Sequence, residues 1–133
     1  MDGMHEVKEA IEAMNLFKQL FGSSAVSVPA VNPREARELL KCKQPPFLLD
    51  VRQPEEYHAG HIAGATLIPL GELRIRAEEL PPDRDILCVC HSGSRSGAAA
   101  RQLAALGFKT LNLAGGMSAW QRTGLPVKKG TAR

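Results

Sequence analysis

The sequence is poor in cysteine and in aromatic residues. Its 133 residues include three cysteines, Cys42, Cys88 and Cys90. These are too few and too unevenly spaced for a disulfide framework or a zinc site. Aromatic residues make up 5% of the chain, and no cluster of Lys and Arg is interleaved with them, so we expect no nucleic-acid partner. The net charge of +3 is mild and favours small anions locally.

The sequence also lacks several segments that would define other classes of protein. It has no signal-peptide pattern and no apolar run of membrane-spanning length, which with unpaired cysteines indicates a reducing, cytoplasmic setting. It has neither a Rossmann fingerprint nor a phosphate-loop lysine pattern, so we expect no cofactor. His58 and His61 have no third ligand at suitable spacing, so we expect no metal.

Strand-like and helical patterns alternate along the chain, which predicts one α/β domain with a parallel sheet. The predicted strands are 26–28, 47–51, 66–68, 86–90 and 108–113, and the predicted helices are 33–41, 54–57, 70–80, 96–106 and 117–122. We divide the chain into an N-terminal helix and linker (1–24), the α/β domain (25–127) and a basic C-terminal tail (128–133). The tail is expected to be disordered.

Apolar residues recur at helical spacing from residue 4 to residue 21, which predicts an amphipathic helix. Such a helix could pack on its own domain, associate with a second copy, or dock on a membrane or another partner. Four acidic residues against two lysines argue against anionic lipid. We therefore favour intramolecular packing or a homodimer over a membrane surface.

The chain is organised around residues 86–97, where an apolar strand delivers Cys90 into a short polar loop and an alanine-rich helix follows. A helix N-terminus and the nearby Arg95 would both favour the thiolate form of Cys90. Small residues at Ser92, Gly93 and Ser94 allow the backbone N–H groups to turn inward around an anion or a persulfide sulfur. The alternative is a structural cysteine at a strand end. Cys88 lies on the same strand face as Cys90 and is expected to be a core residue. Cys42 is also expected to be structural.

Five blocks in order resemble rhodanese-like sulfurtransferases. They are residues 48–52 (Leu-Leu-Asp-Val-Arg), 55–57 (Glu-Glu-Tyr), 60–65 (Gly-His-Ile-Ala-Gly-Ala), 90–96 (Cys-His-Ser-Gly-Ser-Arg-Ser) and 115–120 (Gly-Gly-Met-Ser-Ala-Trp). The resemblance extends roughly from Val28 to Pro126, and several ordered blocks are more specific than one motif.

The resemblance implies a five-stranded parallel sheet flanked by helices. It also implies transfer of a sulfane sulfur from a small anionic donor such as thiosulfate, through a Cys90 persulfide, to cyanide, a thiol or a partner protein. The site residues that it implies are Cys90 as nucleophile, His91, Ser92, Gly93, Ser94, Arg95 and Ser96 around the substrate, and Asp50 and Arg52 as supporting residues. A direct contact of Asp50 and Arg52 with the substrate is the less favoured alternative. His61 is expected to be structural. Whether Arg95 points into the pocket or braces it stays open.

Two other functions remain in view. Dual-specificity phosphatases and arsenate reductases, which resemble this fold, place five residues between cysteine and arginine. Here four residues lie between Cys90 and Arg95, and the smaller loop favours a single sulfur over a tetrahedral oxyanion. A non-catalytic interaction module is the other alternative, and the presence of Cys90 argues against it.

Overall fold

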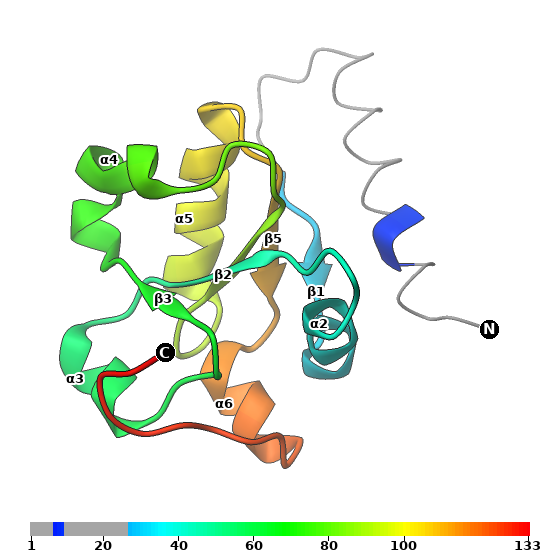
Figure 1. Ribbon diagram of the computed structural model, residues 1–133, viewed down its shortest axis with the longest axis vertical. Coiled ribbons are helices and arrows are strands. Elements are labelled where there is room, and N and C mark those ends of the chain that lie inside the picture. The colour runs from blue at the N-terminus through cyan, green and yellow to red at the C-terminus, as the bar shows by residue number, and fades with distance from the viewer. Residues whose placement is uncertain (1–6, 10–26) are drawn as a thin grey trace.

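The computed structural model describes residues 7–9 and 27–133 (Figure 1). Five parallel strands form one sheet in the order β1-β5-β4-β2-β3. The strands are β1 (Ala30–Val31), β2 (Phe47–Asp50), β3 (Thr66–Leu67), β4 (Ile86–Val89) and β5 (Thr110–Leu113). The α-helices are α2 (Pro33–Leu40), α3 (Pro54–Ala59), α4 (Leu73–Arg76), α5 (Ser94–Ala105) and α6 (Gly116–Arg122). The predicted five-stranded parallel α/β architecture is confirmed.

Helices cover both faces of this sheet, as a parallel sheet requires (Figure 1). On one face α2 and α6 enclose a core that includes Leu87, Leu111 and Trp120. On the other face α4 and α5 enclose a core that includes Cys88 and Leu103. The two cores alternate along β4 because successive side chains of a strand point to opposite faces.

The structure corrects several predicted boundaries. The first strand is Ala30–Val31 instead of 26–28, and the 70–80 segment is a short α4 between two 3₁₀ turns, Leu70–Glu72 and Ala77–Glu79. Ile75, an apolar residue of α4, is 82% exposed. The helix predicted from residue 96 begins at Ser94, so Ser94 and Arg95 belong to its first turn.

The start of α2 agrees with the sequence pattern. Asn32 accepts a hydrogen bond from the backbone N–H of Glu35, and the Glu35 carboxylate accepts one from the N–H of Asn32. With Pro33 in the first turn, these bonds form a capping box at the start of the helix predicted over 33–41. These bonds fix the N-terminus of α2, which follows β1 at the same edge of the sheet as Cys90.

Most of the predicted N-terminal helix lies outside the described residues. Residues 7–9 are helical, and Val7 packs against the core beneath α2 and α6. The homodimer proposed for this helix stays a prediction. In the part of the chain that the structure describes, no helix is long and apolar enough to cross a membrane.

The C-terminal tail is not disordered, contrary to the prediction. His61 and Lys128 exchange two backbone hydrogen bonds, and the carbonyl of Ala132 lies 2.8 Å from Nε2 of His61. Arg133 donates to the Thr66 hydroxyl at 2.8 Å. The sequence suggested disorder because the tail is basic and has few apolar residues, but backbone pairing with the 58–66 segment holds it.

Candidate active site

Cys90 follows β4 directly and lies at the carboxyl edge of the sheet, where α/β proteins collect their ligands. The residue is 0% exposed. Gly93 precedes the first turn of α5 with a φ of 101°, in the left-handed region that favours glycine. A Cβ at Gly93 would also lie 3.3 Å from the backbone nitrogen of Gly115. This tight turn folds the loop back over the Cys90 sulfur.

The Cys90 sulfur has hydrogen-bond donors on the side of the helix N-terminus. The Gly93 N–H donates to Sγ at 3.1 Å, and the Ser96 hydroxyl oxygen lies 3.2 Å from it. Burial raises the pKa of the Cys90 thiol, but hydrogen bonds from the Ser96 hydroxyl and from the N–H groups of Ser96, Gly93 and Ser92 outweigh it. The pKa is therefore lower than that of an ordinary thiol, so the geometry favours a thiolate nucleophile.

Gly115 and Gly116, at the start of α6, let this helix close the loop from the other side. The N–H groups of Met117 and Ser118 donate to the carbonyls of Cys90 and His91 at 2.8 and 2.9 Å. Gly116 has a φ of 58°, and a Cβ there would lie 2.6 Å from the His91 carbonyl carbon and would also clash with the carbonyl oxygen of Cys90. Only glycine allows α6 to bind the loop backbone this closely.

Replacement of Gly116 by alanine is therefore expected to lower the free energy of unfolding by about 2 kcal/mol or more and to displace the loop. Gly124→Ala is the matched control, because Gly124 has a φ of 79° but no atom within 4 Å of its Cβ position. Chemical denaturation measures both variants. Equal losses in the two variants would contradict the close approach at Gly116.

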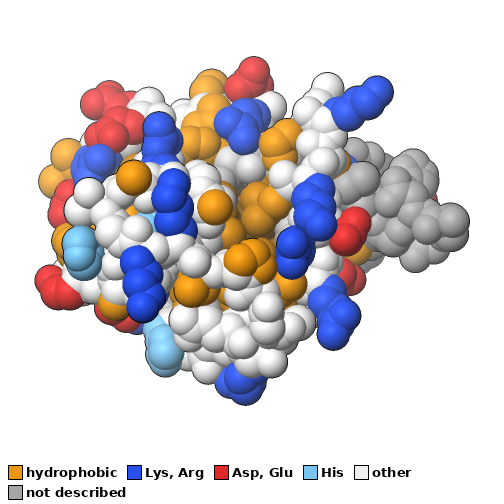
Figure 2. Space-filling view, turned by 60° about the horizontal axis from the view of Figure 1, so that its bottom comes forward, with side chains coloured by type: hydrophobic (Ala, Val, Ile, Leu, Met, Phe, Trp, Pro, Cys, Tyr) orange, Lys and Arg blue, Asp and Glu red, His pale blue; other side chains and the backbone are white. Residues whose placement is uncertain are grey.

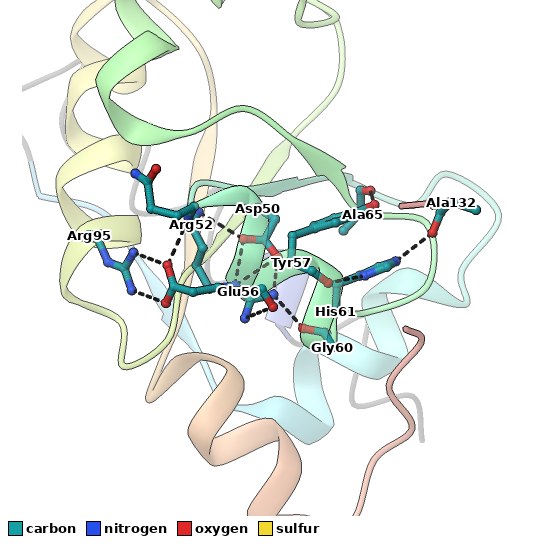
Figure 3. A network of polar contacts seen from close by, with 10 residues as sticks. Asp50, Arg52, Glu56, Tyr57, Gly60, His61, Ala65, Arg95 and Ala132 are labelled. Atoms are coloured by element: carbon teal, nitrogen blue, oxygen red, sulfur yellow. Dashed lines mark hydrogen bonds and ion pairs between the residues drawn. The ribbon is translucent and has the colours of Figure 1, made fainter. Parts of the chain in front are cut away.

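The guanidinium of Arg95 binds the carboxylate of Glu56 on α3 (Figure 3). Its two terminal nitrogens donate to the two carboxylate oxygens of Glu56 at 2.7 and 2.9 Å. The hydrogen bond from Arg95 holds the pKa of Glu56 at about 2, well below its ordinary value. Arg95 therefore braces the loop against α3, which answers the question that the spacing left open.

Glu56→Gln is expected to cost about 1 kcal/mol of stability at neutral pH, because the pair is bidentate yet one-third exposed. The Glu56 pKa is lowered from 4.5 to about 2. The ion pair therefore contributes fully above pH 4.5, and its contribution is lost as the pH falls towards about 2. Denaturation of wild type and variant across this range measures the effect, with the exposed Glu55→Gln as control. A stability difference that stays constant with pH would contradict the pairing.

Asp50 and Arg52 form a buried ion pair at the end of β2. They are 0% and 4% exposed, and Arg52 donates to both carboxylate oxygens of Asp50, the shortest bond being 2.7 Å. Arg52 also donates to the backbone carbonyls of Glu56 and Gly60 (Figure 3). The pair thus holds α3, which carries Glu56, and supports the 91–96 loop through that helix instead of touching the loop itself.

The remaining loop residues face solvent. His91, Ser92 and Ser94 are exposed, and no described side chain of these three bonds to the sulfur. A groove of about 360 Å³ lies beside the loop and is lined by Arg52, Glu56, Ala59, Gly60, His91, Met117 and Gln121. The groove gives a small molecule a path alongside the loop that covers Cys90.

Cys88 and His61 lie outside this chemistry. Cys88 is 0% exposed in the core beneath α5, and burial raises the pKa of its thiol, with the charge of Cys90 adding to the effect. His61 is buried, stacks on Tyr57 at 3.7 Å, and faces the carbonyls of Tyr57 and Ala132. Both agree with the structural roles predicted for them. Among residues 7–9 and 27–133, no group of three His, Cys, Asp or Glu side chains could hold a metal ion.

Two polar residues of the site were not identified from the sequence. Glu56 lies 39 positions before Arg95 and was noted only as part of the Glu-Glu-Tyr block. The sequence signal for a structural role of Glu56 was its position three residues after Gln53, where the acid of a capping box stands. Asn112 of β5 contacts both Ser96 and Gly93, and nothing in its local pattern points to this.

The fold and the site together define a class of protein. It is a parallel α/β domain with a cysteine of lowered pKa, held in a loop of backbone N–H donors at the N-terminus of a helix. Residues 32–123 match the family described as "Rhodanese-like domain". The chain belongs to this family.

Curated relatives and solved structures agree with this assignment. The chain is 40% identical over 98 residues to the "Putative sulfur carrier protein YrkF" of Bacillus subtilis, covering 73% of this chain and about half, 53%, of that protein. It is 43% identical over 82 residues to a "Sulfurtransferase" of Allochromatium vinosum, covering 61% of this chain and 77% of the relative. A rhodanese-related protein from Thermoplasma volcanium superposes with a TM-score of 0.71 at 34% identity, covering 75% of this chain and 97% of that one. These similarities support a rhodanese-like sulfurtransferase function.

Proposed function

We propose that this chain moves a sulfane sulfur from a small anionic donor such as thiosulfate to a thiophilic acceptor through a Cys90 persulfide. The observation that carries the proposal is the Cys90 sulfur, which lies within 3.1 Å of the Gly93 N–H and 3.2 Å of the Ser96 hydroxyl. These donors stabilise a negative sulfur before and after transfer. A reducing, cytoplasmic setting belongs to the same proposal, because the reaction starts from a free thiolate.

The reaction has two covalent steps. The Cys90 thiolate attacks the sulfane sulfur of thiosulfate, a new sulfur–sulfur bond forms, and the old one breaks with its electron pair leaving on sulfite. The outer sulfur of the persulfide then carries the negative charge beside the loop N–H groups. A nucleophilic acceptor attacks that sulfur, and the electron pair of the persulfide bond returns to Cys90 as thiolate.

Arg95 favours sulfur chemistry over phosphate chemistry. A phosphatase needs an arginine that binds the transferred oxyanion, whereas both terminal nitrogens of Arg95 donate to Glu56. The loop also holds four residues between Cys90 and Arg95. A small nest with a braced arginine suits one sulfur atom better than a tetrahedral group.

The surroundings of the site suit an anionic donor. Figure 2 brings forward the end of the molecule where α3 and α6 lie in Figure 1. On this face Lys and Arg side chains surround apolar and uncharged surface, and acidic side chains lie mostly at its margin (Figure 2). A positive rim raises the local concentration of small anions. We propose that the donor reaches Cys90 along the groove between His91, Glu56 and Met117.

The acceptor is proposed by its chemistry. Cyanide serves in an assay, and a thiol or the thiolate of a partner protein would serve in the cell, because each is a soft nucleophile that can attack a persulfide sulfur. A purely non-catalytic interaction module is disfavoured by the lowered pKa of Cys90, which such a module would not need.

The test is the steady-state formation of thiocyanate from thiosulfate and cyanide. We expect two-substrate kinetics of the ping-pong type, since sulfite leaves before cyanide reacts. Hydrolysis of an aryl phosphate is measured in parallel. Phosphate release without sulfur transfer from any sulfane donor would overturn the proposal in favour of the phosphatase. The absence of both activities would favour the interaction module.

A further inference from the structure

We propose that Asn112 is a positioning residue for sulfur transfer. It holds the Ser96 hydroxyl so that the O–H bond can turn either towards the Cys90 sulfur or towards Asn112. This inference rests on the proposed function for its purpose, but its geometry and its test concern the thiol alone. Asn112 lies on β5, the strand beside β4, and its register partner there is Cys88.

The Asn112 amide connects the two groups that contact the sulfur. The Ser96 hydroxyl lies 2.6 Å from Oδ1 of Asn112, and Nδ2 of Asn112 donates to the Gly93 carbonyl at 3.0 Å. The orientation of the amide is fixed by this network, because a carbonyl oxygen only accepts and must face Nδ2. Oδ1 therefore faces Ser96 as an acceptor.

The Ser96 hydroxyl has one proton and two acceptors within reach. These are Oδ1 of Asn112 at 2.6 Å and Sγ of Cys90 at 3.2 Å. When Cys90 is a thiol or an uncharged inner sulfur of a persulfide, Oδ1 is the better acceptor. When Cys90 is a thiolate, its charge attracts the same proton. Asn112 thus competes with the sulfur and limits how strongly Ser96 stabilises the thiolate.

Loss of Asn112 does not free the Gly93 carbonyl, because that carbonyl also accepts from the N–H of Gly97 at 3.1 Å. Charged and titratable neighbours stay in place as well. Cys90 interacts with Cys88 on the same strand and with Arg95 on α5, and Arg95 interacts in turn with Glu56 and Asp50. Asn112 carries no charge. Replacing it with leucine therefore removes one of the two acceptors of the Ser96 hydroxyl and leaves these charges unaltered.

The strength of this competition matters for turnover. A thiolate held too strongly is a weaker nucleophile, because nucleophilicity falls as the thiol pKa falls. By competing for the Ser96 hydroxyl, Oδ1 of Asn112 weakens the hydrogen bond from Ser96 to the thiolate and so keeps the thiolate reactive. It also leaves the loop N–H groups as the donors to the outer sulfur of the persulfide.

The experiment is the pH dependence of Cys90 alkylation by iodoacetamide, followed on the Cys90 peptide by mass spectrometry. In Asn112→Leu we expect the midpoint to fall, so that alkylation below the midpoint is about threefold faster than in wild type. Ser96→Ala should raise the midpoint. In the double variant, Asn112→Leu should have no further effect, because Asn112 acts through the Ser96 hydroxyl.

Thr110→Val is the matched control. Thr110 lies two residues before Asn112 on the same face of β5 and bonds the Ala100 carbonyl of α5, away from the loop. This control should lose stability without moving the midpoint. An unchanged or raised midpoint in Asn112→Leu, or an equal shift with Ser96 absent, would overturn the inference. Because alkylation needs only the thiol, failure of sulfur transfer would appear separately in the thiocyanate assay.

Discussion

Cys90→Ser is expected to reduce thiocyanate formation from thiosulfate and cyanide by at least about 10³-fold. A serine hydroxyl is not ionised at neutral pH and cannot form a persulfide. The sulfur of Cys90 is also the atom towards which the Gly93 N–H and the Ser96 hydroxyl point. The variant should remain folded, because serine is close to cysteine in volume and both loop donors can bond its oxygen.

Cys42→Ser and Cys88→Ala are the controls for the other two thiols. Cys88 lies in the core beneath α5, so Cys88→Ala should lower stability while the activity of the folded fraction stays within a few-fold of wild type. Cys42 is half-buried and far from the loop in sequence, and its replacement should leave activity unchanged. Retention of activity in Cys90→Ser, or its loss in Cys42→Ser, would contradict the assignment of the nucleophile.

Arg52→Met is expected to cost about 3 kcal/mol or more in the free energy of unfolding. Asp50 is 0% exposed and would lose the partner that donates to both of its carboxylate oxygens. The carbonyls of Glu56 and Gly60 would lose the same guanidinium. Such a loss exceeds that of an ordinary surface pair, because a buried carboxylate without a partner retains its desolvation cost. Urea denaturation measures it.

Arg76→Met is the matched control, since Arg76 bonds Glu72 and Glu79 on the exposed side of the 70–79 segment. Its loss should be far smaller than that of Arg52→Met. The double variant Asp50→Leu/Arg52→Met should recover part of the stability, because it removes the buried charge along with its partner. Equal losses in Arg52→Met and Arg76→Met would show that the buried pair does not hold α3.

The sequence predicted those features that depend on local pattern. Asn32, Pro33 and Glu35 predicted the start of α2 because a capping box is formed by residues three positions apart. Cys90 could be identified because a strand, a small-residue loop and an alanine-rich helix are adjacent in the chain. The order of blocks similar to rhodanese-like proteins then predicted the five-stranded sheet.

Features that depend on tertiary contact could not be predicted in this way. The partner of Arg95 is Glu56, on a helix that the sheet order brings near α5, and the partner of Ser96 is Asn112, on a neighbouring strand. The tail was expected to be disordered from its basic composition, because its contact with His61 spans more than half the chain and leaves no local pattern. Similarly, β1 is set by its pairing with β5 and not by local strand propensity.

The most direct test of the account is the intact mass of the protein after treatment with thiosulfate and removal of excess donor. Wild type is expected to gain one sulfur atom that cyanide removes, and Cys90→Ser is expected to gain none. Gain of the same sulfur by Cys90→Ser, or an unchanged wild-type mass with thiosulfate and with every other sulfane donor, would contradict a Cys90 persulfide.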